Sequence, residues 1–168
     1  SLLREKGEAS LGGPARARTE TISPGTQTPE TYLGSLRARG WADDPLRDGE
    51  RDFGANPPLL SPNEFAYLGT WGVGPESAAA REEAGIVAEI RARRVFLVMG
   101  SPGEPREVEV LLDGRPVPNA VAGDDVRGSR VSVSAQRLYR LIDLPRAGRH
   151  RLELRFDDGV EGYAFTFG

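Results

Sequence analysis

The chain contains no cysteine, only one lysine (Lys6) and only one histidine (His150) among its 168 residues. The lack of cysteine excludes disulfide bonds, thiolate metal sites and a cysteine nucleophile within this chain. It leaves the compartment open, because a domain that needs no disulfide folds on either side of a membrane. His150 lies between Arg149 and Arg151 with no evident partner for a triad or a metal site, so we expect it at the surface or at a sheet edge.

A strong charge of either sign is also absent, since the net charge is −3. Nucleic-acid binding usually needs clustered basic surface, whereas the arginines here are spread among acids, so no nucleic-acid partner is expected. No apolar run is long enough to span a bilayer and no signal peptide opens the chain, so we expect no membrane contact from it. The start at Ser1 rather than at a methionine indicates a fragment or a processed product.

The first 28 residues differ in composition from the rest of the chain. Residues 1–7 are typical of the end of a helix, with Gly7 at its C-terminal cap. Residues 12–18 have the composition of a linker, which predicts a domain boundary near residue 20 and a second unit over residues 21–168. Residues 29–63 are rich in proline and glycine, which indicates a long irregular segment with one or two edge strands.

From residue 64 onward the sequence indicates β-structure. Apolar residues alternate with charged ones, as in a strand with one wet face, and the run 95–99 is apolar throughout, as in a central strand. Asp113-Gly114, residues 145–148 and Asp158-Gly159 supply turns between short strands, which predicts an antiparallel meander. Because no long amphipathic helix is present after residue 30, the sheets must cover each other. The expected fold is all-β: an antiparallel β-sandwich of jelly-roll type with a short N-terminal helical remnant. The expected strands cover residues 66–73, 86–91, 95–99, 107–112, 131–133, 137–142, 152–156 and 163–167.

Several of these segments, in this order and spacing, resemble the C-terminal domain of DipZ-type thioredoxin (redoxin) family proteins. The resemblance covers roughly residues 20–168, and the segments that carry it are 28–34, 67–71, 95–100, 110–114, 137–139, 159–160 and 163–168. In that family the domain follows a thioredoxin-like redox domain and is a jelly roll similar to carbohydrate-binding modules. The opening Leu2-Leu3-Arg4-Glu5-Lys6-Gly7 resembles the end of the last thioredoxin helix.

The resemblance implies a bacterial thiol–disulfide oxidoreductase as the parent protein, in an extracytoplasmic or cell-envelope setting. The chemistry of such a parent needs a Cys-x-x-Cys pair, which this chain lacks, so the chain itself is not expected to be an enzyme and no cofactor is expected. The partners implied are a carbohydrate and the protein's own thioredoxin-like domain.

Sugar recognition commonly combines an aromatic face that stacks on the ring with carboxylates that bind hydroxyls. Trp41 and Trp71 are the natural stacking candidates, and the alternative is that both cap the sandwich core, where large aromatics usually lie. The row Tyr163, Phe165 and Phe167 is expected in the core, with only its tyrosine reaching a polar rim. The candidate ligand-binding residues are Trp41, Tyr32, Asp43, Asp44, Trp71 and Tyr163.

Adjacent acids such as Asp43/Asp44, Asp124/Asp125 and Asp157/Asp158 could be read as a glycosidase pair or a calcium loop. Acids in turns usually serve turn geometry and solubility, and no loop has the spacing of a known calcium motif, so no catalytic and no metal residue is assigned. Two functions remain. The chain is either a carbohydrate-binding accessory module or an interaction domain that packs on its thioredoxin domain, or on another copy, through residues 29–63.

Overall fold

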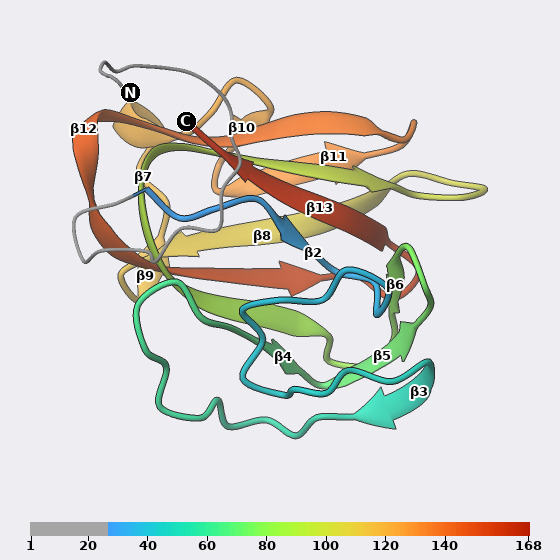
Figure 1. Ribbon diagram of the computed structural model, residues 1–168. Coiled ribbons are helices and arrows are strands. Elements are labelled where there is room, and N and C mark those ends of the chain that lie inside the picture. The colour runs from blue at the N-terminus through green and yellow to red at the C-terminus, as the bar shows by residue number, and fades with distance from the viewer. Residues whose placement is uncertain (1–26) are drawn as a thin grey trace, which may run out of the picture.

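The computed structural model describes residues 27–168 (Figure 1). Nearly all regular secondary structure in this range is antiparallel strand, and the β-sandwich predicted from the sequence is confirmed. The expected helical end and linker over residues 1–20 lie outside the described residues. The elements are β2 (Thr31–Tyr32), β3 (Gly49–Asp52), β4 (Phe65–Leu68), β5 (Thr70–Val73), β6 (Ala78–Ala80), β7 (Gly85–Gly100), β8 (Arg106–Leu112), β9 (Arg115–Pro116), the 3-10 turn η1 (Asn119–Val121), β10 (Val126–Arg127), β11 (Arg130–Val133), β12 (Arg137–Phe156) and β13 (Glu161–Phe167).

Two long strands, β7 and β12, pair antiparallel and run through both layers of the sandwich. Their pairing shifts register between Asp143 and Gly148, where both strands curl over together at the left of Figure 1. On one side of this corner the pair is extended by β8, β11 and β4; on the other side it is extended by β13, β6, β5 and β3. β2 is added to β13. One continuous ladder therefore folds over to cover itself.

The structure corrects three sequence predictions about connectivity. Residues 145–148 do not turn the chain back but form the corner within β12, where the interrupted ladder tolerates Pro145. The predicted strand 66–73 is divided at Gly69, whose φ of +69° takes the chain from β4 to β5. The predicted meander is wrong, because β12 pairs with β7 and β8 rather than with β11 or β13.

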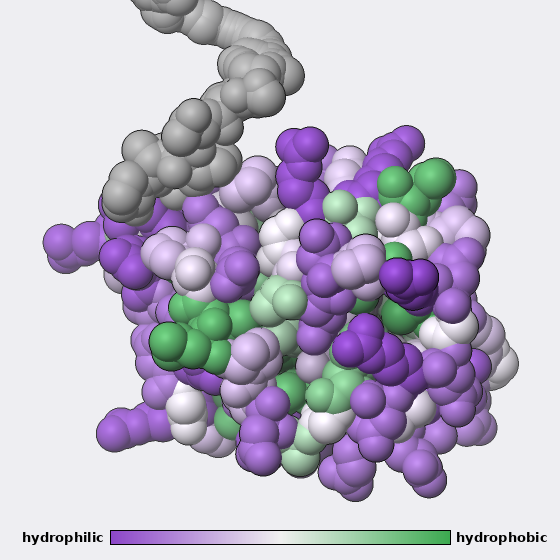
Figure 2. Space-filling view, turned by 60° about the horizontal axis from the view of Figure 1, so that its bottom comes forward, coloured by the Kyte–Doolittle hydropathy of each residue, from purple (hydrophilic) through white to green (hydrophobic). Residues whose placement is uncertain are grey.

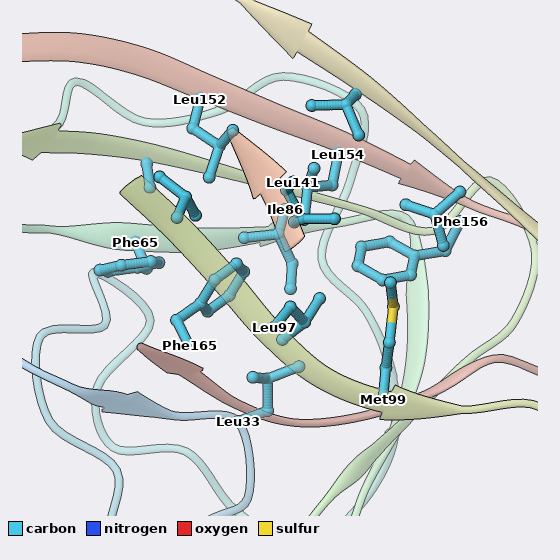
Figure 3. Close-up of a cluster of buried hydrophobic side chains, with 14 of the residues drawn as sticks. Leu33, Phe65, Ile86, Leu97, Met99, Leu141, Leu152, Leu154, Phe156 and Phe165 are labelled. Atoms are coloured by element: carbon cyan, nitrogen blue, oxygen red, sulfur yellow. The ribbon is translucent and has the colours of Figure 1, made fainter. Parts of the chain in front are cut away.

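The core lies between the two layers and is filled by alternating strand residues (Figure 3). Leu33, Phe65, Ile86, Leu97 and Phe165 all have no exposed surface. The alternation is clear in the layer that contains β2, β13 and the adjoining halves of β7 and β12. Directly paired residues on these four strands form an inner row that faces the core: Thr31, Phe165, Leu97 and Tyr139, each 3% exposed or less.

No helix among residues 27–168 is long and apolar enough to cross a membrane.

The opposite faces of β7 give a prediction. Leu97→Ala should lower the free energy of unfolding by about 2 to 5 kcal/mol, because it removes buried methyl groups and leaves a cavity. Val98→Ala, one residue along on the partly exposed face, should cost far less. Urea unfolding of the two variants measures both values, and equal losses would contradict the register described here.

Candidate functional site

The six candidate residues fall into separate environments. The indole of Trp41 is 4% exposed and that of Trp71 is fully buried. Both belong to a chain of ring contacts through the core, in which consecutive centroids lie 4.1 to 6.2 Å apart. The rings follow the order Phe167, Phe165, Phe65, Trp41, Tyr67, Trp71 and Phe156. The two tryptophans thus occupy the core position that the sequence left as the alternative, and neither offers a ring face to a ligand.

The side chains of Trp41 and Tyr67 donate hydrogen bonds from the core to the backbone of β2 and of the residue that follows it. The Trp41 Nε1–H donates to the Tyr32 carbonyl oxygen at 2.8 Å, and the Tyr67 hydroxyl donates to the Leu33 carbonyl oxygen at 2.6 Å. Their rings stack at 4.1 Å with an interplanar angle of 10°. Burial raises the pKa of the Tyr67 phenol well above its ordinary value, with a smaller contribution from Asp43, so this phenol remains a neutral donor. The core aromatics therefore fix the position of Tyr32.

Tyr32 and Tyr163 lie together at the surface. Ala164 of β13 pairs directly with Tyr32 of β2, and the Leu33 amide donates to the Tyr163 carbonyl oxygen at 3.0 Å. A register shift between Gly162 and Ala164 makes Tyr163 the extra residue of a β-bulge against β7. A bulge breaks the strict alternation of faces and re-aims the side chain at that point. Tyr163 is therefore partly exposed, whereas Phe165 and Phe167 are buried as the sequence predicted.

The two tyrosines line a hollow of about 300 Å³, which we call the tyrosine hollow. Its other walls come from the loop after β2 and the turn after β5. The Ser35 and Leu36 amides donate to the Gly74 and Pro75 carbonyl oxygens, both at 2.9 Å, which fastens loop to turn. The lining residues are Tyr32, Gly34, Leu36, Arg37, Pro75, Glu76, Tyr163 and Ala164.

Gly34 is required at the point where this loop meets the turn. A Cβ atom at this position would lie 2.4 Å from the Pro75 carbonyl oxygen, which is too close for any other residue without movement of the backbone.

A carboxylate holds each tyrosine hydroxyl. The Tyr32 hydroxyl donates to Glu30 Oε1 at 3.0 Å, and the Tyr163 hydroxyl donates to Glu161 Oε1 at 3.2 Å. Partial burial and the Glu161 carboxylate raise the pKa of the Tyr163 phenol, which keeps it protonated at neutral pH. Arg37 lies over the Tyr32 ring, 5.2 Å from its centroid. The hollow thus presents two oriented phenol rings beside carboxylates and a guanidinium.

A repeated sequence pattern accompanies this arrangement of tyrosines and carboxylates. Both tyrosines belong to a Glu-x-Tyr sequence, at 30–32 and 161–163. Residues two apart in an extended chain project to the same side, so the carboxylate can reach the phenol hydroxyl. Glu30 and Glu161 could have been found in this way. Leu36, Arg37 and Glu76 could not, since only the folded loops bring them to the hollow.

Asp43 and Asp44 lie away from the hollow. The half-buried Asp43 Oδ2 accepts a hydrogen bond from the Tyr67 amide at 3.1 Å, and Asp44 is exposed in the following loop. Burial raises the pKa of the Asp43 carboxyl above 3.8, although the Tyr67 amide and the Arg51 charge act to lower it. Asp43 therefore links the loop after Trp41 to β4, and it does not line the tyrosine hollow.

A larger hollow of about 630 Å³ lies between the β3–β4 segment and the ends of β7 and β12. Its charged lining residues are Asp52, Glu82, Glu83, Glu153 and Arg155, and Glu153 accepts from Arg155 Nε at 3.1 Å. Its aromatic residue, Phe156, is 6% exposed. Among the described residues, no three acids, histidines or cysteines form a group that could hold a metal ion. This hollow lacks the exposed rings that the tyrosine hollow has.

His150 has a partner that the sequence did not reveal. Its Nδ1 lies 2.7 Å from Asp113 Oδ2, and Asp113 Oδ1 accepts from the Arg151 amide at 2.9 Å. Partial burial acts to raise the pKa of the Asp113 carboxyl, but these two hydrogen bonds and the histidine charge outweigh it, so the pKa is lowered. The contacts fasten the Asp113-Gly114 turn to β12, which is a structural role.

The comparisons with known proteins bear on the family and the fold. The family model described as thioredoxin-like C-terminal domain matches residues 28–168. The chain belongs to that family. No curated protein matches it.

Among solved structures, a family two carbohydrate esterase from Cellvibrio japonicus shares 16% identity with this domain at a TM-score of 0.50, over 61% of this chain and 30% of that one. The family two carbohydrate esterase from Clostridium thermocellum in complex with cellohexaose shares 19% identity at a TM-score of 0.44, over 55% and 27%. The domain thus spans less than a third of either chain, and at such identities the likeness to the first concerns the fold alone.

The burial of Trp41 gives a prediction. Trp41→Ala should lower the free energy of unfolding by about 3 to 5 kcal/mol, because it removes a buried ring stacked on Tyr67 and the donor to the Tyr32 carbonyl. Thermal and urea unfolding measure the loss. A nearly unchanged stability would place the indole at the surface instead.

The raised pKa of Asp43 gives a second prediction. A carboxyl whose pKa is raised on folding contributes most stability below 3.8, and this contribution is lost as the pH rises through the folded-state pKa. Asp43→Asn removes the ionisation and keeps an oxygen to accept from the Tyr67 amide. The variant should therefore gain stability relative to the wild type between pH 3 and pH 7, as measured by urea unfolding across that range. A difference independent of pH would contradict the assignment.

Proposed function

We propose that this domain is a non-catalytic accessory domain of a DipZ-type redoxin-family protein and that it binds carbohydrate at the tyrosine hollow. The observation that carries the proposal is the pair of partly exposed rings, Tyr32 and Tyr163, which line one hollow and donate their hydroxyls to carboxylates. An aromatic face offers apolar contact to the C–H groups on one side of a sugar ring. A hollow of about 300 Å³ lies at the small end of the range for ligand sites.

The polar groups that sugar hydroxyls need either line the tyrosine hollow or accept hydrogen bonds from its two tyrosines. In each of Glu30 and Glu161, Oε1 accepts from a tyrosine, which leaves Oε2 as a second acceptor. Glu76 and Arg37 also line the hollow and add an acceptor and a donor. Hydroxyl groups donate and accept, so this mixture suits a polyhydroxylated ligand better than a purely apolar or singly charged one.

The hollow is suited to binding rather than to reaction. The thiol chemistry of a redoxin requires cysteine, which this chain lacks. The two carboxylates nearest the rings are engaged by the tyrosine hydroxyls, an arrangement that orients the rings. In this role the domain retains the parent protein on a glycan surface, while the redox chemistry belongs to another domain.

A second candidate function is docking on the thioredoxin-like domain through residues 29–63. It is favoured by Leu59, which is fully exposed in the segment between β3 and β4. Figure 2 brings this side of the molecule forward and shows its hydrophobic residues in separate patches among hydrophilic ones. A docking face of standard size needs a larger continuous contact. The carbohydrate function therefore has the better support.

The test is binding to a panel of immobilised glycans that includes linear β-1,4-linked glucans, chitin fragments, mannans and α-1,4-linked glucans. The wild-type domain should bind one class. Tyr163→Ala should weaken that binding by about tenfold or more, which corresponds to the loss of roughly 1.4 kcal/mol of ring contact and hydrogen bonding. Because Tyr163 is partly exposed, the variant should remain folded.

Leu59→Ala is the matched control, since it removes an exposed apolar side chain outside the hollow and should leave binding unchanged. Absence of binding across the panel, together with binding of the separate thioredoxin-like domain, would favour the docking function.

A further inference from the structure

A row of partly exposed side chains crosses the outer face of the layer that carries the tyrosine hollow. Its members are directly paired residues on four neighbouring strands, and such residues project from the same face of a sheet. Each member is adjacent in sequence to one residue of the buried inner row described under the overall fold. Because neighbouring residues of a strand project to opposite faces, the outer row points to solvent. Across β2, β13, β7 and β12, the row consists of Tyr32, Ala164, Val98 and Leu138.

The row begins at the hollow and leads away from it. Tyr32 and Ala164 line the hollow itself. From there the row continues over Val98 to Leu138, which is 39% exposed. Neighbouring strands lie about 4.8 Å apart, so three steps extend the row for about 14 Å. The hollow is thus one end of a longer apolar strip.

Polar groups accompany the strip along one side. A second row lies two residues from the strip along each of three strands. In this row Thr166 of β13 is paired with Phe96 of β7, and Phe96 is paired with Arg140 of β12. These three side chains project from the same face as the strip. The strip therefore has a hydroxyl and a guanidinium beside it, separated by one further partly exposed ring.

Apart from Phe96, which lies beside Val98, the strip is one side chain wide, and this narrow width restricts what binds to it. A stable protein interface involves about 20 to 30 residues on each side and about 800 Å² per partner. Four partly buried side chains with polar neighbours provide much less. A narrow apolar strip with hydrogen-bonding groups beside it instead fits a thin, extended ligand whose rings present both C–H faces and hydroxyls.

We infer that Val98 and Leu138 continue the tyrosine hollow into a binding track for an extended glycan chain of several sugar rings. This inference rests on the proposed carbohydrate function and makes it more specific: the ligand is the interior of a linear polysaccharide and not a single terminal sugar. The ring nearest the hollow contacts Tyr32 and Tyr163, and the following rings lie over Val98 and Leu138. Thr166 and Arg140 are the hydrogen-bonding groups along the track.

The test is a series of chain lengths measured by isothermal titration calorimetry. The probes are the monosaccharide, trisaccharide and hexasaccharide of β-1,4-linked glucose, N-acetylglucosamine and mannose and of α-1,4-linked glucose. For the class that binds, the hexasaccharide should bind at least about tenfold more tightly than the monosaccharide. Leu138→Ser should remove most of this gain and leave monosaccharide affinity unchanged. Tyr163→Ala should weaken binding at every length.

Two further variants keep the test decisive. Val98→Thr retains the β-branched shape of the side chain and should reduce the same gain, which covers the case in which Leu138→Ser fails to fold. Leu59→Ser removes a fully exposed leucine elsewhere and should change nothing.

Each other outcome overturns a distinct part of the inference. Equal affinities for the monosaccharide and the hexasaccharide, both dependent on Tyr163, would overturn the track and leave the proposed function intact. An undiminished gain in Leu138→Ser and Val98→Thr would also overturn the track. Absence of binding at every length for all four glycans would overturn the proposed function and the track together.

Discussion

The pairing of β7 with β12 is the constraint on which the rest of the structure depends. Each strand contributes to both layers, so the two sheets are fixed relative to each other by a continuous backbone ladder as well as by side-chain packing. The shared corner at residues 143–148 sets where the ladder folds over. All other strands are added to one side or the other of this pair, and β13 and β2 take their positions from the half of β7 beyond the corner.

The candidate site follows from that framework in two steps. β13 must pair with β7 in register for Phe165 and Phe167 to be buried. The bulge at Tyr163 interrupts this register, so the Tyr163 ring turns outward and lies on the same side as Glu161. β2 is only two residues long and has little ladder of its own. Its position is fixed from the core by Trp41 and Tyr67, which donate hydrogen bonds to the carbonyl oxygens of Tyr32 and Leu33. The buried aromatics thus fix the backbone that carries the exposed Tyr32 ring.

The strands and the sandwich could be predicted from the sequence because alternation of apolar and polar residues reports directly on which face is buried. Connectivity could not, because Pro145 and Gly69 look the same in sequence whether they reverse the chain or pass it to the other layer. Only part of the candidate site can be predicted from the sequence. Tyr32 and Tyr163 are candidates on sequence grounds, but a bulge leaves no sign in the sequence, and the acids beside Trp41 make this core residue resemble an exposed one.

A pre-ordered but shallow site has consequences for the kind of binding it supports. Rings that are already fixed by hydrogen bonds lose little conformational freedom when a ligand arrives, which raises affinity without new contacts. The hollow is small, however, and a narrow strip buries little surface, so affinity for a single ligand is expected to be modest. In the proposed role, modest affinity is sufficient, because a polysaccharide repeats the same ligand many times and so keeps its local concentration high at the surface. The proposed track thus suits retention on a surface better than capture of a free sugar.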